Sequence, residues 1–116
     1  MTAPKVPEHL IQNQILDYLK IKGCYVWRNN TGAFVRNYYN MREGRWKETY
    51  FRSGQRGLPD ILGVAPDGKL IAIEVKSATG KVSPEQKTTL QEMANRGAWA
   101  FVARSLLDVE NVFGGL

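Results

Sequence analysis

The chain has 116 residues, of which 43% are apolar and 23% charged, so we expect one globular domain over residues 1–116 rather than a disordered or fibrous protein. No stretch approaches the roughly 18 apolar residues of a membrane span, and the amino end lacks a secretory pattern. We therefore expect an intracellular protein, cytoplasmic in a bacterial or phage-infected cell. Its formal charge of +5 favours an acidic partner.

The first half of the chain predicts a helix, a strand and a β-hairpin. Apolar residues recur at helical spacing over residues 7–22. The β-branched and aromatic run at residues 24–28 then predicts a short strand. Two aromatic-rich runs at residues 33–39 and 45–51 flank a break at residues 40–44, and they predict a hairpin that projects from the domain.

The second half predicts two paired strands, a helix, a strand and a last helix. Apolar runs at residues 60–65 and 70–75 flank a Pro-Asp-Gly turn, which favours antiparallel pairing. A capping serine, a proline and a glutamine at residues 83–86 begin a helix that reaches about residue 96. A strand at residues 98–103 and a helix from Ser105 or Asp108 complete an α/β domain around a small mixed sheet.

The positive charge is concentrated in one segment. Residues 20–56 contain nine Lys or Arg and two acids, which gives this segment +7 and the rest of the chain −2. Clustered arginines grip phosphates, and interleaved aromatics can stack on bases or can simply pair across a hairpin. We predict phosphate contacts for the arginines of this segment, which are Arg28, Arg36, Arg42, Arg45, Arg52 and Arg56.

Two charged residues lie at the end of the apolar strand predicted at residues 70–75, Glu74 within it and Lys76 directly after it. Glu74 and Lys76 are two apart, so both side chains leave the same face of the strand. The turn after the preceding strand can lay Asp60 beside Glu74. Unpaired charges are costly in such a place, and either an ion pair or a functional site accounts for them. We favour a site, in which Asp60, Glu74 and the carbonyl of Val75 hold a metal ion.

The role of Lys76 stays open at this point, because an ammonium group can orient the attacking water, help to deprotonate it or steady the charged phosphate. Phosphodiester hydrolysis needs an activated water and stabilisation of the charge that gathers on the phosphate, and carboxylate-held Mg²⁺ can supply both. This is the chemistry that the Asp60, Glu74 and Lys76 side chains suit best.

Three sequence runs together resemble a known family. GLPDILGV, IAIEVKS and GKVSPEQK, with Asp60 and Glu74 separated by thirteen residues, are similar to the PD-(D/E)xK nuclease superfamily and, within it, to the virus-type replication-repair nucleases, VRR-NUC. The resemblance implies a restriction-endonuclease-like αβββαβ core with an inserted hairpin and a C-terminal helix. It also implies Mg²⁺ or Mn²⁺ as cofactor, structured DNA as substrate, Asp60 and Glu74 as metal ligands and Lys76 as the catalytic lysine.

The resemblance implies two further site residues, each with a competing interpretation. Gln86 would support the site, yet it also fits a capping box with Ser83, and the two roles coexist only if its amide divides its hydrogen bonds. Glu8 on the first helix would reach the metal, yet a carboxylate there also complements the helix dipole.

From these features we expect an endonuclease that resolves four-way DNA junctions as a homodimer, since symmetric incisions suit a two-fold assembly. The alternatives are a branched-DNA-binding module without catalysis and a nuclease directed to flaps or nicks. A restriction-type enzyme with base readout ranks last in so short a chain. Two surfaces are candidates for the dimer contact, the hairpin at residues 34–51, which we favour, and the terminal helix with Leu106, Leu107, Val112, Phe113 and Leu116.

Overall fold

The computed structural model describes residues 5–29, 33–52 and 57–115, with the backbone alone at residues 33–35 and 50–52. Within these ranges no helix has the length and apolar character needed to cross a membrane. The described elements agree with the predicted ones to within about two residues at each end. In chain order they are α1 (Glu8–Ile21), β1 (Tyr25–Arg28), β2 (Ala33–Asn40), β3 (Arg45–Arg52), β4 (Ile61–Val64), β5 (Leu70–Val75), α2 (Pro84–Asn95), β6 (Trp99–Ala103) and α3 (Leu106–Phe113).

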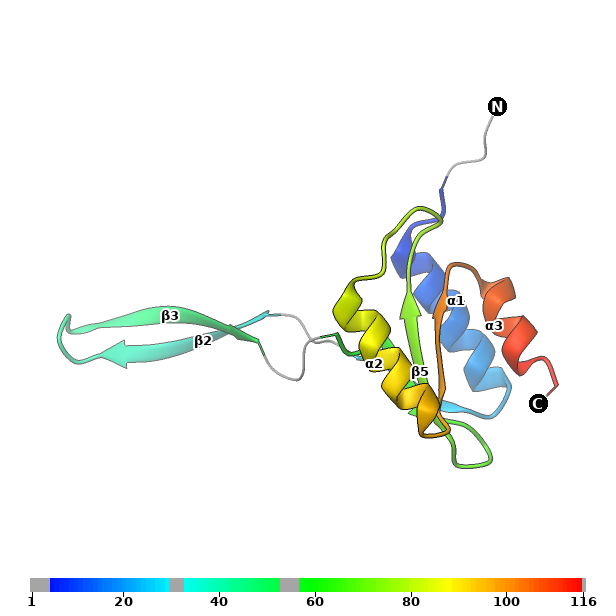
Figure 1. Cartoon of the computed structure of the whole chain (residues 1–116). Coiled ribbons are helices and arrows are strands. Elements are labelled where there is room, and N and C mark those ends of the chain that lie inside the picture. The colour runs from blue at the N-terminus through cyan, green and yellow to red at the C-terminus, as the bar shows by residue number, and fades with distance from the viewer. Residues whose placement is uncertain (1–4, 30–32, 53–56, 116) are drawn as a thin grey trace.

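Four strands form a mixed sheet in the order β1-β4-β5-β6. The β1–β4 and β4–β5 pairs are antiparallel, whereas β5 and β6 are parallel, because helix α2 provides the crossover between them. Helices α1 and α3 lie on one face of this sheet and α2 lies on the other (Figure 1). The predicted α/β class with a mixed sheet is confirmed.

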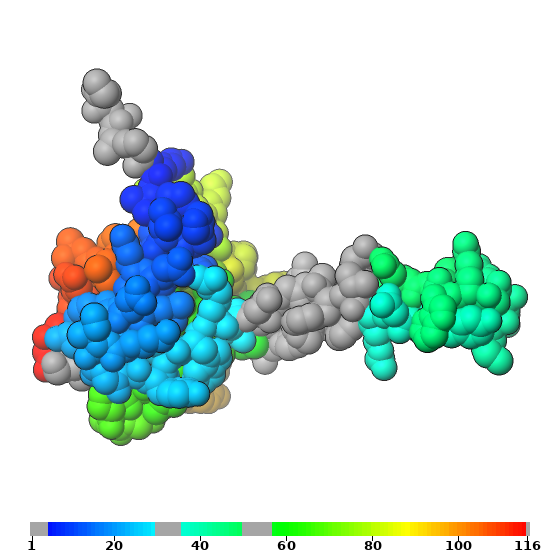
Figure 2. Space-filling model, turned by 180° about the vertical axis from the view of Figure 1, so that it is seen from behind, coloured from blue at the N-terminus to red at the C-terminus, as the bar shows by residue number. Residues whose placement is uncertain are grey.

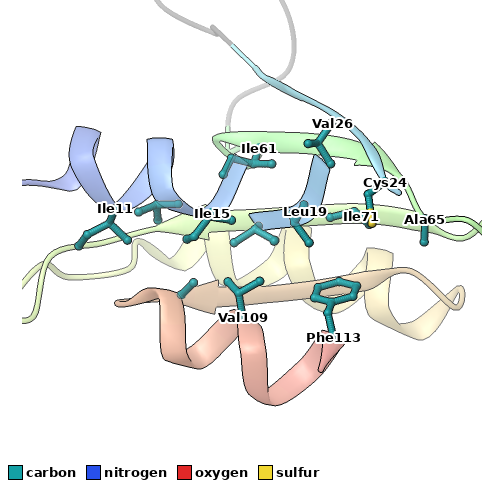
Figure 3. Close-up of a cluster of buried hydrophobic side chains, with 13 residues drawn as sticks. Ile11, Ile15, Leu19, Cys24, Val26, Ile61, Ala65, Ile71, Val109 and Phe113 are labelled. Carbon is teal, nitrogen blue, oxygen red and sulfur yellow. The ribbon is translucent and has the colours of Figure 1, made fainter. Parts of the chain in front are cut away.

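Helix α1 forms because its apolar residues share one stripe. Ile11, Ile15 and Leu19 are four apart and all three are buried. In Figure 3 they point toward the sheet from one helix, while Val109 and Phe113 of α3 enter the same core. The dimer hypothesis for the terminal helix loses part of its basis here, because Phe113 is fully buried within the subunit.

The central strand β5 alternates between two environments. Ile71, Ile73 and Val75 face the α1–α3 core and are fully buried. Glu74 lies between them in sequence and therefore faces the opposite side, toward α2. The predicted separation of apolar and charged side chains on this strand is confirmed.

Helix α2 covers β5 and β6, while apolar side chains of β1 and β4 on the same face remain open. Tyr25 and Trp27 of β1 are 76% and 43% exposed, with ring centroids 5.9 Å apart in an edge-on arrangement. Val64 and Leu70 on the next two strands are both 40% exposed. The sequence predicted the length of β1, but the exposure of these side chains depends on which strands α2 covers.

Strands β2 and β3 form a separate two-stranded sheet that projects away from the rest of the chain (Figures 1 and 2). The radius of gyration is 17.7 Å, against about 13 Å for a compact chain of this length. The turn closes with Gly44 at a φ of 62°, a conformation that favours glycine. The predicted projecting hairpin is confirmed.

The register of the hairpin separates its side chains onto two faces, because residues that face each other across the strands share a side. Arg36 and Tyr38 pair with Thr49 and Lys47, and Asn40 pairs with Arg45, so one face carries three cations. We call the face formed by Arg36, Tyr38, Asn40, Arg45, Lys47 and Thr49 the cationic face. Asn37, Tyr39, Trp46 and Glu48 form the opposite face, which we call the aromatic face, and its Tyr39 and Trp46 rings lie 5.6 Å apart.

Candidate active site

The turn between β4 and β5 sets the position of Asp60. Ala65 and Lys69 are joined by a backbone hydrogen bond of 2.9 Å, and Gly68 takes a φ of 90° at the turn. The resulting register pairs Ile61 with Ile73, so the next residue outward, Asp60, comes opposite Glu74. The juxtaposition of the two carboxyl groups that the turn predicts is confirmed.

Asp60 is tied directly to the strand that carries Glu74. Its Oδ2 accepts a hydrogen bond of 2.9 Å from the N–H of Val75. The carboxyl group thereby continues the pairing of β4 with β5 beyond the last strand residue. Asp60 is half-buried, and the bond fixes its side chain beside the end of β5.

Glu74 is the buried charged residue among the described side chains, with 3% of its surface exposed. Its Oε1 accepts a hydrogen bond of 3.0 Å from Nε2 of Gln86 and lies 3.4 Å from Nζ of Lys76. Its Oε2 is buried without a hydrogen-bond partner in the described part of the chain. A buried carboxylate with one free oxygen is costly unless a ligand completes its contacts.

Burial, and next the neighbouring Asp60 carboxyl, raise the pKa of Glu74 to about 7, although Lys76 acts in the opposite direction. Two carboxylates that crowd one pocket repel each other when both are charged. A cation held between them would relieve this repulsion, whereas a structural ion pair with Lys76 alone leaves it in place. The geometry therefore favours a site over a purely structural ion pair.

Gln86 makes the contacts of both interpretations that its sequence context left open, the capping box and a hydrogen bond to Glu74. Its Oε1 accepts from the N–H of Ser83 at 2.9 Å, and its own N–H donates to Ser83 Oγ at 3.1 Å, which completes the capping box of α2. Its Nε2 remains available and donates to Glu74. The amide divides its hydrogen bonds between helix cap and site, so the cap orients the side chain toward Glu74.

Glu8 lies near the site and binds the backbone there. Its Oε1 accepts from the N–H of Ser77 at 3.2 Å, one residue beyond Lys76. Among residues 5–29, 33–52 and 57–115, no three His, Cys, Asp or Glu side chains gather closely enough to hold a metal ion. Within these ranges, no third acidic side chain joins Asp60 and Glu74 closely enough to share an ion with them.

This donor set fits Mg²⁺ or Mn²⁺. Mg²⁺ keeps several waters and takes one or two carboxylates together with substrate phosphate oxygens. The free Oε2 of Glu74 and the adjacent Asp60 supply two hard oxygen donors, and the Val75 carbonyl is the third donor expected from the sequence. An all-protein cage, such as structural zinc requires, does not match this set.

Comparison with known families shows to which class of domain this chain, with its Asp60 and Glu74 carboxylates, belongs. The family model of the VRR-NUC domain matches residues 6–106. The chain belongs to the VRR-NUC family. A solved structure described as a VRR_NUC domain shares its fold, with a TM-score of 0.60 and 23% identity over 93% of this chain and 95% of that chain. No curated protein matches.

Membership in the VRR-NUC family makes this chain a nuclease domain of the PD-(D/E)xK superfamily. The predicted restriction-endonuclease-like core agrees with the structure and with the fold of the related VRR_NUC domain. In this chain the PD and ExK patterns on which the sequence resemblance rests are Pro59-Asp60 and Glu74-Val75-Lys76.

Six arginines of this VRR-NUC domain were expected to contact phosphates, and those that the structure describes do not form one cluster. Arg28 donates to Asn13 Oδ1 at 2.6 Å, against helix α1. Arg36, Arg42 and Arg45 are exposed on the hairpin, where Arg45 is paired with Glu43 at 3.1 Å. The side chain of Arg52 and the whole of Arg56 lie outside the described residues, as does Leu116 of the C-terminal tail.

Two features of this VRR-NUC domain were missed by the reading of the sequence. The separation of the hairpin into a cationic and an aromatic face was available from the alternation of residue types, given a pairing of Asn40 with Arg45. The second feature is Arg104, which donates to backbone carbonyls near Lys76. A single arginine after a strand carries no sequence signal of its own.

Proposed function

We propose that this VRR-NUC domain is a Mg²⁺- or Mn²⁺-dependent endonuclease that hydrolyses phosphodiester bonds of branched DNA. The observation that supports it is the buried Glu74, which has a free oxygen and lies beside Asp60, with Lys76 on the same face. This arrangement does not stabilise the fold, because the two carboxylates repel each other when both are charged.

Asp60 and Glu74, with the Val75 carbonyl, would hold the metal. When bound, a divalent cation supplies Lewis acidity toward the phosphoryl oxygens and the attacking water. The bond from Val75 N–H to Asp60 Oδ2 leaves the other oxygen of Asp60 for that purpose. Glu74 is held in orientation by Gln86, so its free oxygen points to a fixed place.

Lys76 supplies positive charge beside the carboxylates. Its side chain is 16% exposed and its Nζ lies 3.4 Å from Glu74 Oε1. An ammonium group in this half-enclosed place is suited to steady the negative charge that collects on the phosphate during hydrolysis. In this scheme Lys76 is the catalytic cation, and the contact with Glu74 orients it before DNA binds.

The hairpin provides a surface for the DNA backbone. Its cationic face presents Arg36, Arg45 and Lys47 on one side of an arm that stands clear of the domain. Glu43 pairs with both Arg45 and Lys47, at 3.1 Å and 2.7 Å, which reduces the net charge at the tip. Counterion release from phosphates rewards clustered cations without regard to base sequence, which suits a nuclease that recognises DNA shape.

The proposed substrate is a four-way junction, cut by a homodimer. A two-fold dimer presents two identical sites to a symmetric junction. The aromatic face of the hairpin favours the arm as the dimer contact, since Trp46 is 71% and Tyr39 46% exposed. Large exposed aromatics on the side away from the cations are typical of protein contacts.

A panel of DNA substrates tests this function. Linear, nicked, flapped and four-way DNA of matched sequence are incubated with the protein in Mg²⁺, in Mn²⁺ and in excess chelator. We expect metal-dependent cleavage, fastest on the four-way junction and with paired incisions. Preference for flaps or nicks would replace the junction assignment. Tight DNA binding without cleavage in either metal would identify a non-catalytic binding module and refute the enzyme assignment.

A further inference from the structure

The loop formed by residues 77–80, here called the 77–80 loop, directly follows Lys76. It is closed by a hydrogen bond of 3.2 Å from the N–H of Gly80 to the carbonyl of Ser77. The chain then continues to helix α2, which carries Gln86. Because site residues lie on both sides of it, the position of this loop sets where they meet.

The backbone that leads into the 77–80 loop is held at three consecutive N–H groups. Each group donates to an acceptor from a different part of the fold: the residue before β4, the end of β6 and the start of α1. Such a sequence of bonds leaves this backbone little freedom. The donors are Val75, Lys76 and Ser77, and their acceptors are Asp60 Oδ2 at 2.9 Å, Ala103 O at 3.0 Å and Glu8 Oε1 at 3.2 Å.

The carbonyl side of the 77–80 loop is held by one side chain, Arg104. Its Nη1 donates to Ser77 O and to Gly80 O, both at 2.7 Å. Arg104 is half-buried, and its own N–H donates to Asp108 Oδ2 at 2.8 Å, at the start of α3. The guanidinium thus connects the junction of β6 and α3 to the segment that follows Lys76.

Ser77 is therefore held by opposite charges at its two backbone groups. The carboxylate of Glu8 accepts a hydrogen bond from the N–H of Ser77, and the guanidinium of Arg104 donates one to its carbonyl. Hydrogen bonds that involve an ionised partner are roughly twice as strong as neutral ones. Ser77 receives two such bonds, and it lies next to Lys76 in the chain.

The surroundings of Gly80 show how closely these groups approach the site. A Cβ atom there would lie 3.3 Å from Ser77 Oγ, and 3.4 Å from both Glu8 Oε1 and Lys76 Cβ. Gly80, the anchoring carboxylate of Glu8 and the Cβ of Lys76 therefore lie close together. Because Ser77 directly follows Lys76 in the chain, a displacement of Ser77 would also move Lys76.

We propose that Arg104 and Glu8 are positioning residues, which clamp Ser77 from both sides and thereby fix Lys76 and the Val75 carbonyl. The inference rests on the proposed function of the site. It gives Glu8 the role of a backbone anchor in place of the metal ligand that the family resemblance implied. Neither residue touches the reacting atoms in this scheme. Loss of such supporting contacts around metal sites typically lowers activity or metal affinity about 10–100-fold.

The test compares Arg104→Gln with a matched control, Arg96→Gln. Arg96 also donates to a backbone carbonyl and a carboxylate, both of Glu92, at 2.9 Å and 2.5 Å, but it lies at the far end of α2. Amide hydrogen exchange of metal-free protein is measured at residues 76–80. Single-turnover cleavage with enzyme in excess and the Kd for DNA in chelator are measured on the same preparations.

For Arg104→Gln we expect exchange at residues 76–80 about tenfold faster, a cleavage rate about 10–100-fold lower and a Kd for DNA within about twofold of wild type. Arg104→Lys, which can still donate to one carbonyl, should recover part of the rate. Arg96→Gln should match wild type in all three measurements. A folded Arg104→Gln protein with wild-type exchange, or with wild-type cleavage, would overturn the proposal. Should the wild-type protein cut no DNA, the proposed function fails, and the exchange comparison alone decides whether Arg104 clamps the loop.

Discussion

Substitution of Glu74 by glutamine should make the metal-free protein more stable at alkaline pH. Burial and the Asp60 carboxyl raise the pKa of Glu74 from 4.5 to about 7. The unfolded chain loses this proton near the ordinary value, whereas the folded chain retains it up to about pH 7. Stability contributed by this group is therefore greatest at acidic pH and falls as the pH rises from about 4.5 to about 7.

The size of the effect follows from the same displacement. A pKa raised from 4.5 to about 7 corresponds to about 3 kcal/mol at about 1.4 kcal/mol per unit. Local relaxation and access of water reduce this figure, and we expect about 2 kcal/mol. Because glutamine does not ionise, Glu74→Gln should lack the penalty, so its stability relative to wild type should rise by about 2 kcal/mol between acidic and alkaline pH.

Urea unfolding in chelator, at about pH 4.5 and about pH 8, measures this difference. Comparison of each protein with itself at the two pH values removes any change in packing that the substitution causes. Glu85→Gln is the matched control, since Glu85 is an exposed acid on α2 beside Gln86. If Glu74→Gln and wild type showed the same pH dependence, the crowding of Asp60 and Glu74 would be absent in solution, and with it the physical reason for a cation between them.

Three further predictions concern the rest of the site and the arm. Gln86→Ala removes the side-chain half of the capping box and the contact with Glu74, while its backbone N–H still donates to Ser83 Oγ, so it should cost about 1–2 kcal/mol in urea unfolding and slow cleavage more than tenfold. An unaltered rate would show that this residue only caps the helix. Joint replacement of Arg36, Arg45 and Lys47 by glutamine should flatten the slope of log Kd for DNA against log salt by about two to three. An unchanged slope would show that the cationic face does not contact DNA. Light scattering of the wild-type protein should give about twice 13.1 kDa, and Trp46→Ala should shift it toward the monomer, whereas a monomeric wild type would refute the dimer.

The central part of the fold was predictable because local signals and long-range pairing agree there. The Pro-Asp-Gly turn between β4 and β5 fixes the register, and a register shift by one residue would have turned Glu74 into the apolar core. Alternation along β5 then determines which face carries charge. Asp60 and Glu74 could therefore be paired from the sequence, and the structure places them together.

The supporting contacts were not predictable, because they join residues distant in the chain through geometry that no local pattern encodes. Glu8 and Ser77 are 69 residues apart, and Arg104, which donates to the Ser77 carbonyl, is 27 residues from it. Gln86 had a recognisable capping pattern, but its second bond depends on how α2 crosses the sheet. Helix packing, which places these side chains, is set by the sum of many contacts and not by a motif.

Cleavage by wild type and by Asp60→Asn tests whether the Asp60 and Glu74 carboxylates hold the metal ion needed to cut DNA. Single-turnover cleavage of a four-way junction is measured over a series of Mg²⁺ and Mn²⁺ concentrations, with DNA binding in chelator measured alongside. We expect wild type to cut only with metal, and Asp60→Asn to bind DNA with a Kd within about twofold of wild type but to cut at least about a hundredfold more slowly. Wild-type cleavage by Asp60→Asn, or cleavage by wild type in excess chelator, would contradict this expectation.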